Sequence, residues 1–135
     1  MTKDFNPLIF KSYDIRGHYP TQINEKIVSR LIFFLAKFFK NGKIVIGHDT
    51  RLSSPLIYQT VIKTFEKFPG FQLEKIGLST TPMFYFLVNK LKAKAGIMIT
   101  ASHNPKNDNG LKIVERKAQM ISGKTILKII KKYEN

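Results

Sequence analysis

A serine and a histidine stand next to each other in a short polar segment, residues 99–110, which reads ITASHNPKNDNG. Apolar runs on both sides of the segment predict strands, so Ser102 and His103 are expected in a loop at a strand end. A serine in such a loop can act as a nucleophile, because loop N–H groups stabilise the anion that develops beside it. The alternative is a solvated turn, which is the usual environment of a lone serine.

Three further polar segments are expected to accompany this loop: residues 14–17, 48–51 and 79–82. Ligands of an open α/β sheet bind outside the carboxyl ends of its strands, where such loops gather. Together the loops offer Arg16, Arg51 and a helix start, which are common means of holding phosphate. The glycine-rich dinucleotide motif and the Walker lysine loop are both missing from the sequence. The loops therefore indicate an anion site of another kind.

Alternating helical and strand patterns must position these loops. Short apolar runs predict strands, and apolar residues at helical spacing predict helices; the extended segments are 8–13, 43–47, 71–76, 95–100 and 111–114, and the helices are 23–40, 54–68, 82–91 and 123–133. Such alternation predicts an α/β fold, a three-layer α/β/α sandwich with a mixed, mostly parallel sheet of about four strands. A loop rather than a helix joins the last two strands, so the last strand is expected to be antiparallel.

The composition limits the protein class. A length of 135 residues fits a single domain, 1–135, and the absence of cysteine excludes disulfides and thiolate metal sites. The most apolar run, 31–39, is too short and too charged to span a bilayer, and no secretory signal pattern is present, so a cytoplasmic location is expected. The formal net charge of +14 favours anionic partners, which include phosphorylated metabolites, nucleic acid and membrane surfaces. A solvated basic surface explains the same charge.

Four motifs carry a resemblance to a known family. The segment TASHNP at residues 100–105, followed by NGLK, resembles the phosphoserine loop of the α-D-phosphohexomutases, the phosphomannomutase and phosphoglucomutase family. The segments YDIRG, GHDTR and TTP resemble further motifs of that family, in the family's order, and YDIRG is closer to the phosphomannomutase branch. The resemblance extends over about residues 8–115 and covers only the phosphoserine-bearing domain I. The metal-binding, sugar-reading and phosphate-binding motifs of domains II–IV do not occur, so these domains are expected to be absent.

The resemblance implies an isomerase of carbohydrate metabolism that interconverts hexose 1-phosphate and hexose 6-phosphate through a hexose 1,6-bisphosphate, which serves as activator and intermediate. It implies that Ser102 carries the phosphoryl group and that Lys112 is the general acid/base toward the sugar hydroxyl. His103 is then expected to contact the serine phosphate or the substrate. Arg16 is expected to arrange Lys112, and Tyr13 to touch the substrate. The isolated chain is expected to lack turnover.

Each of these residues also has a structural interpretation. Lys112 is otherwise an ordinary surface lysine, Tyr13 a core residue, and His103 a residue that orients its loop. Asp14 is expected to hold its loop. Asp49 is expected to tie neighbouring loops together through a salt bridge, and the role of Arg51 stays open.

The family resemblance also implies a magnesium ion. Mg²⁺ would contact this chain only through Ser102, because a hard cation requires several oxygen ligands and the nearby Asp108 is a weak substitute for a loop of three aspartates. The ion is therefore expected to be bound mainly by residues outside this chain.

Two other functions remain open. The first is a short gene product that complements the remaining mutase domains in trans. The second is a basic module that binds nucleic acid; it is disfavoured because no aromatic and basic residues alternate as in such modules. The expected partners are a phosphorylated hexose and the remaining mutase domains, in cis or in trans, without a membrane. The preference for mannose or glucose is undetermined, because the sugar-reading loop is absent.

Overall fold

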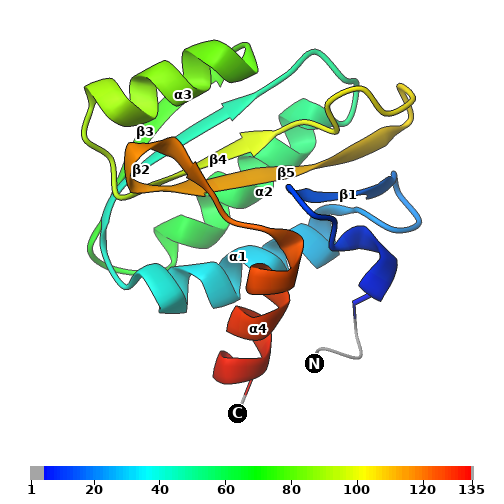
Figure 1. Cartoon of the computed structure of the whole chain (residues 1–135), viewed down its shortest axis with the longest axis horizontal. Coiled ribbons are helices and arrows are strands. Elements are labelled where there is room, and N and C mark those ends of the chain that lie inside the picture. The colour runs from blue at the N-terminus through cyan, green and yellow to red at the C-terminus, as the bar shows by residue number, and fades with distance from the viewer. Residues whose placement is uncertain (1–4, 135) are drawn as a thin grey trace.

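A mixed sheet with helices on both faces forms the centre of the molecule (Figure 1). The computed structural model describes residues 5–134, and these form six strands in the order β1-β5-β4-β2-β3, with β6 paired to β5. The strands are β1 (Ile15–His18), β2 (Gly42–His48), β3 (Phe71–Leu78), β4 (Ala95–Ile99), β5 (Asp108–Glu115) and β6 (Gln119–Met120). The helices are α1 (Glu25–Phe39), α2 (Ser54–Glu66), α3 (Thr81–Lys90) and α4 (Gly123–Tyr133), with short 3₁₀ turns η2 (Pro7–Ile9) and η3 (Arg116–Ala118).

The strand directions follow from the connections between strands. β2 is parallel to β3 and β4, and these strands are joined by the crossover helices α2 and α3. β5 is antiparallel to β4, β1 and β6, since only a loop joins β4 to β5. The predicted α/β/α sandwich with an antiparallel last long strand is therefore confirmed. The number of strands is larger than the predicted four or so, because the short strands β1 and β6 both pair with the edge of β5 that faces away from β4.

The N-terminal segment differs from its prediction. Residues 8–13 were expected to be extended, but Pro7–Ile9 form one turn of 3₁₀ helix, and Phe10 then makes an isolated bridge to Ile15. The strand covers Ile15–His18 instead, where the sequence indicated a loop. Pairing with β5 satisfies the backbone of this short segment, so tertiary contacts override the local pattern.

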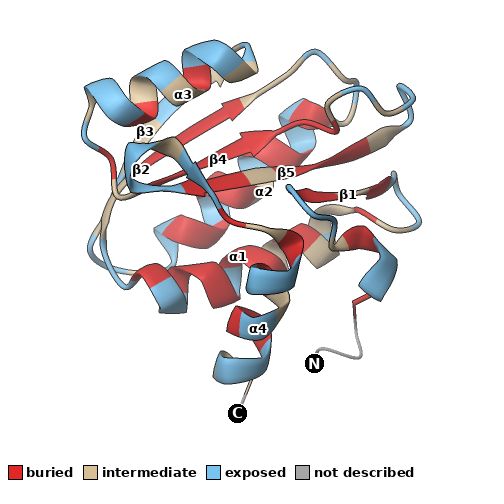
Figure 2. Cartoon of the chain, in the orientation of Figure 1, coloured by how far each residue is buried: buried red, intermediate tan, exposed pale blue. Residues whose placement is uncertain are grey.

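Two cores hold the three layers together. The larger one lies between the sheet and helices α1, α2 and α4, and the smaller one lies beneath α3, where Phe84 and Val88 pack on Val45, Met98 and Val114. All of β4 is buried, as expected for a strand covered on both faces, and the central strands are red in Figure 2 while the outer side of α3 is pale blue. Each large apolar side chain buried in this way contributes about 1.5–3 kcal/mol.

Helix α3 covers its face of the sheet only in part. It packs mainly on β2, β4 and η3, whereas α1, α2 and α4 occupy the opposite face. Side chains alternate along β5, so Leu111 and Ile113 join the large core and Lys112 points to the α3 side, beyond the reach of that helix. The sheet surface over β1 and β5 is therefore left for polar residues. Within residues 5–134, no helix has both the length and the apolar character needed to cross a membrane.

Candidate active site

The loop between β4 and β5 holds Ser102 in an unusual backbone conformation. The φ angle of Ser102 is +56°, in the left-handed region, which costs a residue other than glycine about 1–2 kcal/mol. The Ser102 N–H donates a hydrogen bond to Thr100 Oγ1 at 3.0 Å, and the Asn104 N–H donates to the Ala101 carbonyl at 3.1 Å. The Ser102 Oγ atom is buried and has no hydrogen-bond partner among the described residues. The loop thus isolates the hydroxyl that the sequence marks as a nucleophile.

A buried carboxylate joins the two cations that the sequence selected. The Asp14 side chain is only 2% exposed. Arg16 Nε donates to Asp14 Oδ1 at 2.8 Å, and Lys112 Nζ lies 3.4 Å from Asp14 Oδ2. Arg16 and Lys112 therefore lie side by side on the open surface of the sheet. Arg16 belongs to β1 itself rather than to a loop, which corrects the expectation for residues 14–17.

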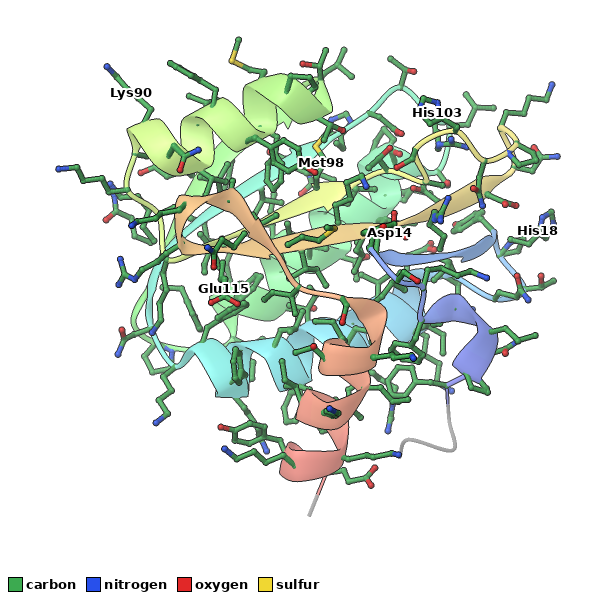
Figure 3. All side chains as sticks on the ribbon, viewed as in Figure 1. Asp14, His18, Lys90, Met98, His103 and Glu115 are labelled. Atoms are coloured by element: carbon green, nitrogen blue, oxygen red, sulfur yellow. The ribbon has the colours of Figure 1, made fainter. Side chains whose placement is uncertain are left out.

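A chain of polar contacts connects β1 to the serine loop. Arg16 Nη1 donates to Asn104 Oδ1 at 2.6 Å, and Asn104 Nδ2 donates to Asp108 Oδ2 at 2.9 Å. Asp108 Oδ1 lies 3.6 Å from Nδ1 of His18, at the far end of β1 (Figure 3). The sequence patterns do not predict Asn104 or His18 as linking residues. The one available signal was the position of Asn104 within the TASHNP motif.

The segment 48–51 supports the serine loop from the side of β2. Asp49 forms a salt bridge with Arg51, with Nε to Oδ2 at 3.2 Å, and Asp49 Oδ1 also accepts the Arg51 N–H and the Ser54 hydroxyl. This arrangement confirms the predicted tie through Asp49. The His48 ring packs against the Tyr58 ring, with centroids 4.7 Å apart, and this contact gives His48 a structural role. The segment 79–82 caps α3, because Thr80 Oγ1 accepts the Met83 N–H.

Two predicted substrate contacts are exposed. Tyr13 is 61% exposed, so the alternative that it packs in the core is wrong. His103 is also exposed, on the loop above Asp14 in Figure 3. Neither side chain is occupied by core packing, and His103 belongs to the serine loop itself.

A cavity of about 710 Å³ borders the serine loop on the side of α2. Its lining includes Ser102, Asn104, Arg51, Leu56 and Tyr19, whereas Arg16 and Lys112 lie outside it. The Tyr19 hydroxyl donates to Glu25 Oε1 at 2.7 Å. This hydrogen bond, together with burial and the negative charge of Glu25, raises the pKa of Tyr19 above 10.0. Asn104 therefore lines this cavity and also contacts Arg16.

The described residues do not gather enough metal-ligating side chains for a metal site. They contain no group of three or more histidine, cysteine, aspartate or glutamate side chains that could hold one. Three carboxylates lie around the site, and each already has partners. Asp14 pairs with Arg16 and Lys112. Asp49 pairs with Arg51, and Asp108 contacts His18 and Asn104. The described part of the chain does not provide a complete magnesium site.

Comparison with known proteins agrees with this geometry. Residues 7–135 match the family model described as phosphoglucomutase/phosphomannomutase, alpha/beta/alpha domain I. The fold and the serine loop are thus those of a phosphohexomutase-type α/β/α domain. The chain belongs to the phosphoglucomutase/phosphomannomutase family.

Individual relatives give the same result. The chain is 42% identical over 116 residues to a protein named phosphohexose mutases from Xanthomonas campestris, covering 86% of this chain and 26% of that protein. It is 42% identical to a phosphomannomutase from Klebsiella pneumoniae, covering 91% of this chain and 78% of the relative. A structure of a putative phosphomannomutase from Thermus thermophilus superposes with a TM-score of 0.81 at 27% identity, over 93% of this chain and 30% of that one. The chain thus spans about a quarter of the Xanthomonas relative's length.

Proposed function

We propose that this chain is the phosphoserine-bearing domain of a phosphomannomutase or phosphoglucomutase. Its enzyme would interconvert hexose 1-phosphate and hexose 6-phosphate through a hexose 1,6-bisphosphate, with Ser102 as the phosphoryl carrier. The observation that carries the proposal is the buried Ser102 Oγ atom without a partner among the described residues. Such a hydroxyl costs about 1–3 kcal/mol, and folded proteins rarely keep one outside a functional site.

The proposed chemistry is transfer of a phosphoryl group between Ser102 and a sugar oxygen. In the forward step the sugar hydroxyl attacks phosphorus, the bond from phosphorus to Ser102 Oγ breaks, and the serine oxygen regains the proton that the hydroxyl loses. Lys112 is the proposed proton carrier between the sugar oxygen and its surroundings. The carboxylate of Asp14 lies 3.4 Å from Lys112 Nζ and holds this side chain beside β1.

The remaining site residues are assigned to binding. Arg16 keeps Lys112 in place through their shared Asp14 and adds a second positive charge, which a phosphoryl group requires during transfer. Tyr13 and His103 are proposed to contact the sugar and the phosphate, since both side chains are exposed. Ser102 would contribute one oxygen to Mg²⁺. The described residues do not complete a site for this ion.

The rest of the proposed enzyme comes from other domains. Because the chain covers 26% of the Xanthomonas relative, we expect sugar reading and metal binding to be supplied by further domains, in cis or in trans. The 135-residue chain alone should not convert mannose 1-phosphate to mannose 6-phosphate at an ordinary enzymatic rate. Such conversion by the purified chain would contradict this part of the proposal.

Intact mass after incubation with hexose 1,6-bisphosphate tests the role of Ser102. We expect the chain to gain one phosphoryl group, because the Ser102 hydroxyl has no partner among the described residues and its loop contacts Arg16 through Asn104. Ser102→Ala should gain none, while Ser12→Ala, which alters an exposed serine, should gain as much as the unmodified chain. Equal gain by Ser102→Ala, or no gain by the unmodified chain, would contradict the proposal that this loop is a competent acceptor.

A further inference from the structure

We propose that Arg51 is the positioning residue of the nucleophile: it fixes the Ser102 loop and does not bind the phosphate itself. The inference rests on the proposed role of Ser102. An arginine beside a phosphate-accepting serine is ordinarily interpreted as a phosphate ligand, because its guanidinium matches phosphate oxygens in pairs. The contacts of Arg51 indicate a different role.

The guanidinium of Arg51 is fully engaged within the protein. Nη2 donates to the carbonyl oxygens of Ser102 at 2.8 Å and Asn104 at 2.9 Å, and Nη1 donates to those of Pro105 at 2.6 Å and Asp108 at 3.1 Å. Nε donates to Asp49 Oδ2 at 3.2 Å. A guanidinium has five N–H donors, and these five acceptors use all of them. The side chain is only 11% exposed, so no donor is left for a ligand.

The four carbonyl groups explain why an arginine occupies this position. Three of them belong to the loop between β4 and β5, and the fourth is that of Asp108 at the start of β5. Backbone carbonyls that leave water need donors. The planar fork of one arginine satisfies all four at once. Lysine carries its charge on a single nitrogen with three donors and cannot reproduce this pattern.

The support behind Arg51 is rigid. Asp49 also accepts the Ser54 hydroxyl, and Ser54 is completely buried at the start of α2. From the other end of the loop, the fully buried Asn109 donates to the hydroxyls of Ser53 and Ser54. Helix α2 is anchored in the large core by residues such as Phe65. Arg51 therefore transmits the position of β2 and α2 to the carbonyl of Ser102.

This link explains how Ser102 keeps its left-handed backbone. A residue in that region stays there only when its surroundings hold it. The bond from Arg51 to the Ser102 carbonyl restrains the peptide that follows the serine. Without that bond, the loop can relax and Oγ loses its fixed place.

The test uses the whole chain with phosphoserine installed at position 102 during synthesis, so that no transfer reaction is needed. The ³¹P resonance and the exchange of the Asn104 and Asp108 amides are measured in Arg51→Lys, Arg51→Gln and Arg116→Gln, an exposed control. We expect both Arg51 variants to move the ³¹P resonance toward that of a phosphoserine peptide. They should also speed exchange of the two loop amides by at least about tenfold, the effect of losing one or two hydrogen bonds. Exchange at Ile46 and Ile97 in the core should stay within about threefold, because only the loop opens.

The lysine variant separates the two roles of Arg51. If charge on the phosphate were the role, Arg51→Lys would keep the unmodified resonance and protected loop amides, and that result would overturn the inference. Uniform acceleration of core and loop amides would also overturn it, because it would show general destabilisation. If both Arg51 variants fail to fold, Asp49→Asn replaces them, because this variant keeps the four carbonyl contacts of Arg51. Its ³¹P resonance must shift in the same direction by a smaller amount. An unchanged resonance would refute the inference. Failure of the unmodified chain to gain phosphate from hexose 1,6-bisphosphate would count against the proposed function alone.

Discussion

Asp14 determines the arrangement of charge in the candidate site. Its carboxylate is buried, yet it contacts the two cations Arg16 and Lys112, one from each neighbouring strand. A buried carboxylate is tolerated only when it is paired, and in turn it prevents the two cations from moving apart. The residue thus has a structural role and, on the proposed function, also sets the geometry of the proton carrier.

Replacement of Asp14 tests this arrangement. We expect Asp14→Asn to lower the free energy of unfolding by about 2 kcal/mol, because two cations lose their buried counter-charge. This loss of stability is smaller than the loss expected for a fully buried ion pair, since the side chains of Arg16 and Lys112 are 25% and 17% exposed. Urea denaturation measures the change. Glu115→Gln, at an exposed acid, should change stability by less than about 0.5 kcal/mol; equal losses in the two variants would contradict the special role of Asp14.

The motifs in the sequence selected candidate site residues but did not predict the contacts between them. The TASHNP motif marked Ser102, and its spacing marked Lys112. The links through Asp14 and Asn104 could not be predicted from composition or periodicity, because they join strands that lie far apart in the chain. The role of Arg51 could not be predicted either, because its acceptors are backbone carbonyls, which any sequence in that loop would supply.

Among the elements, β1 departs most from its sequence pattern. It has only four residues, and three of them, Arg16, Gly17 and His18, are not the apolar residues that would predict a strand. The strand exists because β5 offers its edge, with Arg16 opposite Gly110. By contrast, the apolar strands and the amphipathic helices α1, α2 and α4 followed their patterns, because each buries its own apolar side chains.

The close approach of β1 and β5 makes Gly110 sensitive to substitution. A Cβ atom at Gly110 would lie 1.9 Å from the Ile15 carbonyl oxygen, and this backbone contact cannot be relieved by a side-chain movement. We expect Gly110→Ala to cost at least about 3 kcal/mol in the free energy of unfolding. Thermal or urea unfolding measures the cost.

Gly77 provides the matched control. It has a φ of +68°, and a Cβ atom there would meet nothing within 4 Å. Gly77→Ala should therefore cost only the backbone strain, about 1 kcal/mol. If the two alanine variants were equally stable, the close approach of β1 and β5 would not be the reason for glycine at position 110.

For the whole molecule, the unequal covering of the sheet matters most. One face is covered by three helices, while the other is covered by α3 only over β2 and β4. Arg16, Asp14 and Lys112 occupy the uncovered part, so the charged residues of the site need no burial by a further helix. On the proposed function, this uncovered surface would face the further domains.

The net charge of +14 leads to a prediction about the alternative function. We expect the chain to bind a short DNA duplex without sequence preference, because its charge is diffuse. The affinity for DNA should fall at least about tenfold between about 50 and 200 mM salt, because such binding depends on counterion release. The double variant Arg16→Gln, Lys112→Met should weaken binding of hexose 1,6-bisphosphate but leave DNA binding nearly unchanged. Fluorescence anisotropy and calorimetry measure the two affinities. Tight, sequence-dependent DNA binding at physiological salt would favour the nucleic-acid module instead.

The pairing of β1 with β5 also determines when the site can form. The two strands come from opposite ends of the chain, and closing so long a loop is entropically costly, so this pairing should follow the assembly of β2, β3 and β4 with their local helices. During synthesis the N-terminal strand must wait until β5 has left the ribosome. Arg16, Ser102 and Lys112 therefore meet only in the last stage of folding. On the proposed function, a phosphate on Ser102 would mark a domain whose sheet is already complete.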